Sequence, residues 1–143
     1  MKRSLTEKQI KKHFKELVNT DEAKLVTGNR DSKIKAFQGS IYTFYYRSAT
    51  ATDQLPVILA VLHNGSPTWK AKNGNMYMHG INLNYVSPGV KEYIIEKFGS
   101  ESPLTWGTVK MMSKVTGQEF RKYNRQKQVN LVIVDPTKYL QRT

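Results

Sequence analysis

Apolar residues near the start of the chain recur at the spacing of one face of a helix. They are Ile10, Phe14, Leu17 and Val18, and lysines lie between them. Thr6 and Gln9 come just before, at the spacing of a capping box, in which two side chains bond the free amides at a helix start. The pattern predicts an amphipathic helix over residues 6–18.

Strand patterns fill the middle of the chain. The predicted strands are residues 41–46, 55–62, 68–72, 75–79 and 81–86. The second of these is apolar on both faces, which is typical of a central strand. Asn73 and Gly74, between the third and the fourth, suit a tight hairpin turn. Short strands joined by tight turns predict a small, strongly curved antiparallel sheet or a barrel.

Residues 80–88 join a strand to a helix without a spacer. Gly80 is expected to adopt a positive φ, a conformation in which a Cβ would clash. Ser87 and Pro88 are typical of a helix start, because Ser accepts from free amides and Pro lacks the donor that would stay unpaired. The apolar stripe that follows predicts a helix over residues 87–98. Gly80 and Pro88 are therefore expected to support the fold and not to contact a ligand.

The remainder of the chain returns to helix and strand. Ser102 and Pro103 predict a further helix over residues 105–116, residues 118–126 fit a basic helical turn, and residues 129–134 read as a strand. These elements predict an α+β fold: a small curled antiparallel sheet or SH3-like β-barrel flanked by N-terminal and C-terminal helices. The predicted organisation is a basic helix and linker at residues 1–35 and a single compact α+β domain at residues 36–143.

The net charge of +12 is concentrated at the two ends of the chain. Residues 1–35 hold ten Lys or Arg against five Asp or Glu, residues 36–102 five against four, and residues 103–143 eight against two. A small domain with this balance is typical of a protein that binds a polyanion such as nucleic acid. A basic surface that only aids solubility is the alternative.

The chain lacks the residue patterns of common catalytic and metal sites. It has no cysteine, its three histidines share no metal-ligand spacing, and no glycine-rich phosphate loop is present. No apolar run approaches the ~18 residues of a membrane span. His79 could act as an acid or base near Asp53, but a structural histidine is the favoured interpretation. We expect no enzyme activity, cofactor, metal, membrane contact or small-molecule substrate.

Aromatic and basic side chains alternate at one predicted hairpin and crowd one later segment. The predicted nucleic-acid contacts are Trp69, Lys70 and Lys72 in the hairpin, Arg121, Lys122, Arg125 and Lys127 in the later segment, and Lys11 and Lys12 in the first helix. Aromatic rings flanked by cations make stacking platforms for nucleic-acid bases. The same rings also suit the core of a sheet, so both interpretations remain open.

One motif resembles a family of small proteins from T-even-like tailed bacteriophages. The matching residues are Tyr42, Phe44, Tyr46, Leu55, Pro56, Gly80, Asn82, Leu83, Tyr85 and Pro88, which give a Gly-x-Asn-Leu-x-Tyr-x-x-Pro junction after an aromatic strand and a Leu-Pro step. The resemblance implies a non-enzymatic structural or DNA-end-associated component of a virion, found in the virion and the host cytoplasm.

Three functional hypotheses follow. The first is a virion protein whose basic surface contacts DNA near the genome end or its exit path. The second is a tail or baseplate assembly component that binds acidic protein neighbours. The third is a small-barrel, toxin-like endoribonuclease, for which Arg47 with Thr50, Thr52 or Asp53 would have to meet at a cleft.

Overall fold

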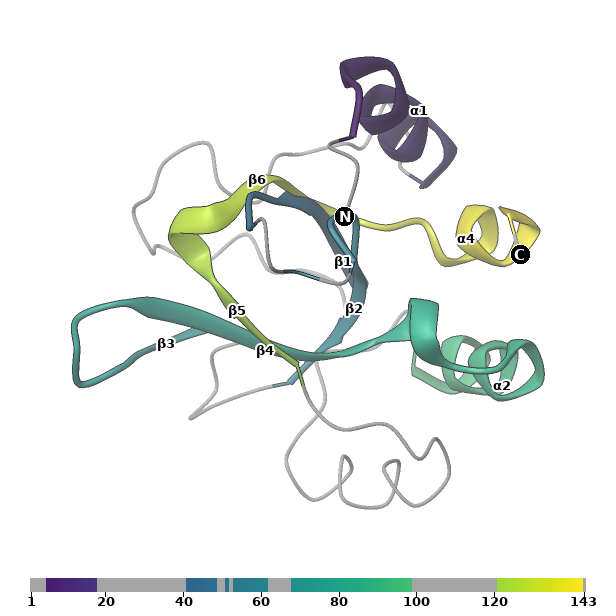
Figure 1. Cartoon of the computed structure of the whole chain (residues 1–143). Helices are drawn as coiled ribbons and strands as arrows, with labels where there is room; N and C mark the ends of the chain where they lie inside the picture. The colour runs from purple at the N-terminus through teal and green to yellow at the C-terminus, as the bar shows by residue number, and fades with distance from the viewer. Residues whose placement is uncertain are drawn as a thin grey trace.

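The computed structural model describes residues 5–17, 41–48, 51, 53–61, 68–98 and 121–142. Within these ranges the fold is α+β, with an antiparallel sheet and helices at both ends of the chain, as predicted (Figure 1). The predicted helix over residues 105–116 lies outside the described residues, as do Thr50 and Thr52.

The first helix, α1, spans Glu7–Leu17 and begins with the predicted capping box. The amide of Thr6 donates to Gln9 Oε1 at 2.8 Å, and the amide of Gln9 donates to Thr6 Oγ1 at 3.1 Å. Leu17 is buried in the core, and its carbonyl accepts from the amide of Asp135 at 2.9 Å. The helix is therefore packed on the body of the domain and carries its lysines outward.

Within the described ranges, six strands form one sheet in which every pairing is antiparallel. They are β1 (Ile41–Tyr46), β2 (Val57–Ala60), β3 (Thr68–Lys70), β4 (Met76–Asn82), β5 (Arg121–Asn124) and β6 (Gln128–Ile133). Met78 pairs with β3 and β5, and Gly80 pairs with β2 and β5. Strands β2 and β3 therefore lie one after the other along the same edge of β4, with β5 on its other edge.

The sheet is open, which corrects the prediction of a curled sheet or barrel closed on itself. Its outermost strands, β5 and β6, are joined through the 3₁₀ turn η2 (Arg125–Lys127), and no pairing links the two strands within the described residues. The prediction of a helical turn over residues 118–126 is also wrong for Arg121–Asn124, which is a strand, whereas the turn is found further on, at Arg125–Lys127. Pairing with β4 makes this segment a strand, although its own residues were read as a helical turn.

Two apolar clusters lie on the two faces of the sheet. One joins the sheet to the helices and includes Leu17, Leu59, Ile81, Ile94 and Tyr139. The other contains Tyr42, Phe44, Ile58, Ala60, Met78, Tyr123 and Leu131, which come from five different strands. Because β2 has one set of residues in each cluster, all four of its residues are buried, as expected of a central strand.

Gly80 lies inside β4 and makes no turn, contrary to the prediction. Its φ is not positive, and among the described glycines Gly74, in the β3–β4 turn, has a positive φ of 86°. A Cβ at Gly80 would lie 2.9 Å from Ile58 Cβ and 2.9 Å from the Leu59 carbonyl oxygen. The position requires glycine because β2 packs too closely for a side chain.

The junction after β4 leads into helices on one side of the molecule. Predicted strand residues 83–85 form a 3₁₀ turn, η1 (Leu83–Tyr85), which Asn82 caps by accepting from the Asn84 amide at 3.0 Å. Helix α2 (Pro88–Phe98) follows as predicted. The C-terminal α4 (Pro136–Arg142) packs against α1, and the β3–β4 hairpin projects from the opposite side (Figure 1).

Candidate nucleic-acid interface

Exposed basic side chains gather on the β3–β4 hairpin, on β5 and on η2. The predicted residues Lys70, Lys72, Arg121, Lys122 and Lys127 are all exposed there. Arg47 joins them, because its amide donates to the Lys127 carbonyl oxygen at 2.8 Å. We call these six residues the basic surface.

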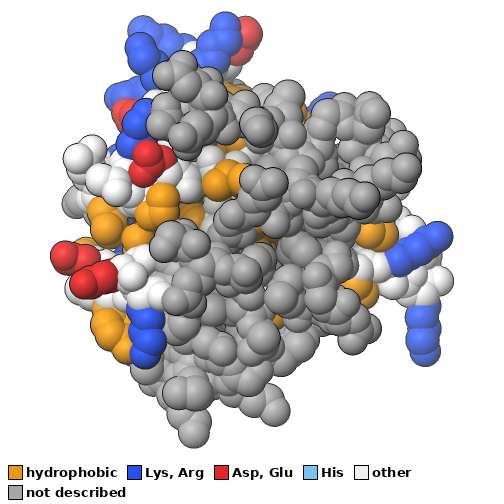
Figure 2. All heavy atoms as spheres, turned by 180° about the vertical axis from the view of Figure 1, so that it is seen from behind, with side chains coloured by type: hydrophobic (Ala, Val, Ile, Leu, Met, Phe, Trp, Pro, Cys, Tyr) orange, Lys and Arg blue, Asp and Glu red, His pale blue; other side chains and the backbone are white. Residues whose placement is uncertain are grey.

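Acidic side chains are scarce near the basic surface and frequent on the helices. Lys11 and Lys12 pair with Glu7 and Glu16 along α1, at 3.4 Å and 3.8 Å. Figure 2 shows the molecule from behind. Basic (blue) and acidic (red) side chains mix over α1 at the top, whereas the basic side chains at the right edge have no acidic neighbour in this view. Among the described residues that line the pocket beside these cations, Asp53 is the single carboxylate. The structure thus separates the predicted contacts Lys11 and Lys12 from the others.

Three rings stack beside the basic surface on β3 and β4. The ring centroids of Trp69 and His79 are 3.9 Å apart, and those of Trp69 and Tyr77 are 5.6 Å apart, with interplanar angles of 35° in both pairs. The Lys122 ammonium lies 4.6 Å from the centroid of Tyr77, since β5 runs beside β4. The hairpin therefore combines partly exposed rings with cations, as the sequence predicted.

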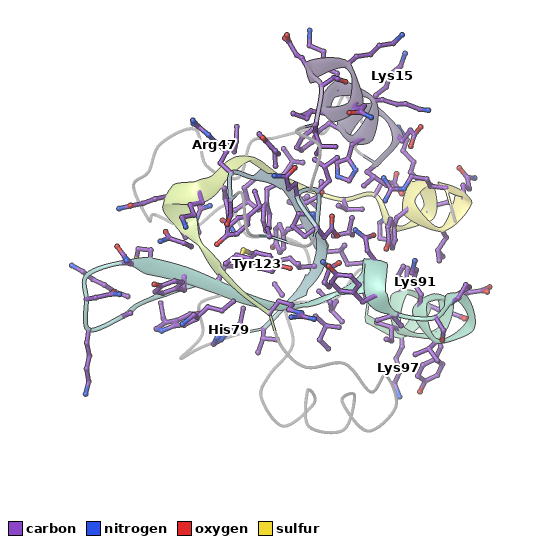
Figure 3. All side chains as sticks on the ribbon, viewed as in Figure 1. Lys15, Arg47, His79, Lys91, Lys97 and Tyr123 are labelled. Atoms are coloured by element: carbon purple, nitrogen blue, oxygen red, sulfur yellow. The ribbon has the colours of Figure 1, made fainter. Side chains whose placement is uncertain are left out.

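A polar pocket of about 360 Å³ shares Arg121, Lys122 and Lys127 with the basic surface. Its lining residues are Tyr46, Ser48, Ala51, Asp53, Tyr85, Arg121, Lys122, Tyr123 and Lys127. Tyr123 points inward from β5, whereas His79 lies on the other side of β4 (Figure 3). The pocket brings together basic residues that the sequence predicted and phenol side chains that it did not assign to a site.

Asp53 is held in place at this pocket by the junction residues. Its Oδ2 accepts from Asn84 Nδ2 at 2.7 Å and from Asn82 Nδ2 at 3.1 Å, while Oδ1 accepts from the Leu55 amide at 3.0 Å. Tyr139 donates to Asn84 Oδ1 at 2.8 Å, which ties the group to α4. Asp53 is thus engaged structurally, and the structure does not place His79 at the pocket with it.

Two further junction contacts position aromatic groups at the pocket. Asn82 Nδ2 donates to the Tyr123 hydroxyl at 3.4 Å, and burial raises the pKa of that phenol above its ordinary range. The Arg121 guanidinium lies 5.4 Å from the centroid of the Tyr85 ring. The motif of residues 80–88 therefore supports both the fold and the pocket, and its Asn and Tyr were the signal that could have revealed this.

Arg125 differs from the other predicted contacts. Burial lowers the pKa of its guanidinium to about 10, and the guanidinium donates to Gln128 Oε1. The group still carries its charge at neutral pH, but it is held inside the turn that joins β5 to β6. Arg125 is therefore held by a contact within this turn, and its contact with a phosphate stays a prediction.

Comparison with known proteins finds no matching family model, no similar curated protein and no similar solved structure. Within the described residues, no helix is long and apolar enough to cross a bilayer. No group of three or more His, Asp or Glu side chains in the same part of the chain is placed to hold a metal ion.

Proposed function

We propose that this protein binds nucleic acid through the basic surface, without sequence preference and without catalysis. The observation that carries the proposal is the gathering of Arg47, Lys70, Lys72, Arg121, Lys122 and Lys127 beside stacked rings, with Asp53 as the single described carboxylate near them. Cations of this kind neutralise backbone phosphates, and the rings offer surfaces for bases.

The Gly80–Pro88 motif supports a more specific setting for this activity. Its resemblance to small proteins of T-even-like phages favours a structural component of a virion that contacts DNA near the genome end or its exit path. The virion and the host cytoplasm are the proposed locations. Other virion proteins are proposed partners, and acidic neighbours in a tail or baseplate are the alternative ligand of the same basic surface.

An endoribonuclease is the less favoured proposal. It would need Asp53 or a nearby hydroxyl to take a proton from the substrate. The Asp53 carboxylate already accepts three hydrogen bonds, from Asn82, Asn84 and Leu55, so its oxygens are largely engaged within the protein. Arg47 approaches Lys127 through the backbone and is not among the residues that line the pocket.

The experiment that tests the proposal is DNA binding by the full chain across a salt series. Contacts with phosphates release counterions, so affinity should fall steeply and linearly on a logarithmic plot as salt rises. A Lys11→Ala, Lys12→Ala variant is the matched control, because it removes two cations that are already paired with glutamates. Stable association with an acidic virion protein, without DNA binding at low salt, would favour the alternative ligand.

A further inference from the structure

The pocket beside the basic surface has the size and chemistry of a site for one small ligand. Its volume of about 360 Å³ is within the range of small-molecule sites in proteins. Cations, phenols, a hydroxyl and one carboxylate line it, so it suits an anion attached to a polar ring system. The walls come from β1, β5, η1, η2 and the segment before β2.

The walls of the pocket are fixed by contacts between distant elements. Tyr46 accepts at its hydroxyl from the Asn124 amide at 3.1 Å, and its ring lies 5.1 Å from the ring of Tyr123. Tyr123 also contacts Phe44, with the centroids 5.1 Å apart. Because these rings join β1 to β5, the pocket is preformed by the core and does not depend on a ligand to assemble.

Three cations at the pocket are available to an anion. Arg121, Lys122 and Lys127 are exposed, and the ion pairs found among the described residues lie on α1, away from them. Arg121 offers a planar fork that can hold a phosphate with two parallel hydrogen bonds. Lys122 and Lys127 add two further positive charges to the lining of the pocket. A phosphate group is therefore the anion that this arrangement fits best.

The neighbouring groups add a stacking surface and an acceptor. The Arg121 guanidinium already lies over the Tyr85 ring, and bases stack on tyrosine rings and on guanidinium planes alike. An ionised carboxylate has about four acceptor positions, of which Asp53 uses three in the described contacts. The remaining position can accept from the amino group of a base or from a sugar hydroxyl.

We propose that this pocket takes one unpaired nucleotide, so that the protein binds single-stranded nucleic acid more tightly than duplex. The phosphate would contact Arg121, Lys122 and Lys127, and the base would stack on the Arg121–Tyr85 pair. A paired base cannot enter without leaving its stack, which costs a few kcal/mol in a duplex. This inference rests on the proposed nucleic-acid binding and adds a preference that the basic surface alone would not produce.

The test compares a labelled single-stranded oligonucleotide with the duplex of the same length, at one salt concentration. The variant is Tyr85→Leu, and the matched control is Tyr93→Leu, which removes an exposed ring on α2. Loss of one stacked base should weaken single-strand binding by about fivefold to a hundredfold. The affinity of Tyr85→Leu for duplex, and both affinities of Tyr93→Leu, should stay within about twofold of wild type. A twofold change corresponds to less than about 1 kcal/mol.

A second measurement uses the unmodified protein and does not depend on the folding of a variant. Adenosine monophosphate, added to isotope-labelled protein, should shift the NMR signals of Tyr85 and Arg121 and leave those of α2 in place. Equal affinity for single strand and duplex, together with no shift at these residues, would overturn the pocket proposal alone. Absence of salt-dependent binding to either form would instead overturn the proposed nucleic-acid function.

Discussion

The guanidinium of Arg121 lies over the ring of Tyr85, 5.4 Å from its centroid. Arg121 opens the edge strand β5, and Tyr85 ends the 3₁₀ turn that follows β4. This contact joins the most basic segment of the chain to the junction of residues 80–88. Positive charge and aromatic surface therefore meet at β5 and not on α1.

Gly80→Ala should destabilise the protein by about 1–3 kcal/mol, the usual cost of overpacking a core. The new Cβ would lie 2.9 Å from both Ile58 Cβ and the Leu59 carbonyl oxygen, and the backbone oxygen cannot move aside cheaply. The control is Gly89→Ala in α2, where a Cβ meets nothing within 4 Å. Chemical denaturation measures both, and equal stability of the two variants would show that β2 and β4 can move apart.

Mild acid should destabilise the protein through His13, which is buried between α1, β1 and α4. Thr43 Oγ1 donates to the Pro56 carbonyl oxygen at 2.8 Å, so it accepts from His13 Nε2 at 2.6 Å. His13 Nδ1 then accepts from Arg142 at 2.9 Å. Burial, together with the charge of Arg142, lowers the pKa of His13 from 6.5 to about 4.

The unfolded chain therefore binds a proton at His13 at a higher pH than the folded chain does. Stability should fall as the pH drops from about 6.5 to about 4, by about 3 kcal/mol in total. In a His13→Gln variant this decline should be absent between those pH values, although carboxylates add their own effect near the lower limit. If the stability of wild type and of the variant falls equally between these pH values, the conclusion that His13 is neutral in the folded protein is contradicted.

Arg125 and Lys127 should respond in opposite ways to replacement by alanine. Arg125→Ala removes a partly buried guanidinium bonded to Gln128, so it should lower the melting temperature and leave the salt dependence of DNA binding unchanged. Lys127→Ala removes an exposed charge, so it should reduce the salt dependence and leave the melting temperature unchanged. The reverse assignment of the two effects would show that Arg125 meets the phosphate.

Local patterns in the sequence were sufficient for most elements of the fold. The capping box at Thr6, the apolar strand β2 and the Asn73-Gly74 turn all depend on neighbouring residues, and each is found in the structure. The need for glycine at position 80 was predicted for the wrong reason. It comes from the close approach of strand β2 and not from the backbone conformation of Gly80. No residue range was predicted for helix α4, because the last pattern recognised was the strand of residues 129–134; Pro136 begins this helix and Asp135 caps it.

The candidate site was predictable in its charges but not in its shape. Lysines and arginines can be counted from the sequence, and Lys70, Lys72, Arg121, Lys122 and Lys127 are exposed on β3, the β3–β4 turn, β5 and η2. The pocket depends on long-range pairing: β5 lies beside β4, and Tyr123 reaches Phe44 on β1. Spacing along the chain gives no access to such contacts, so the Asn and Tyr residues of the 80–88 motif marked a special junction without showing that it meets Arg121 and Asp53.

The most direct test of nucleic-acid binding is the salt slope of a fourfold variant, Lys70→Ala with Arg121→Ala, Lys122→Ala and Lys127→Ala. If each residue neutralises one phosphate of duplex DNA, the slope of log affinity against log salt should become shallower by about 3.6 units. The melting temperature should be retained, because all four side chains are exposed. A fourfold variant that folds like wild type and keeps the full salt slope would contradict binding through the basic surface.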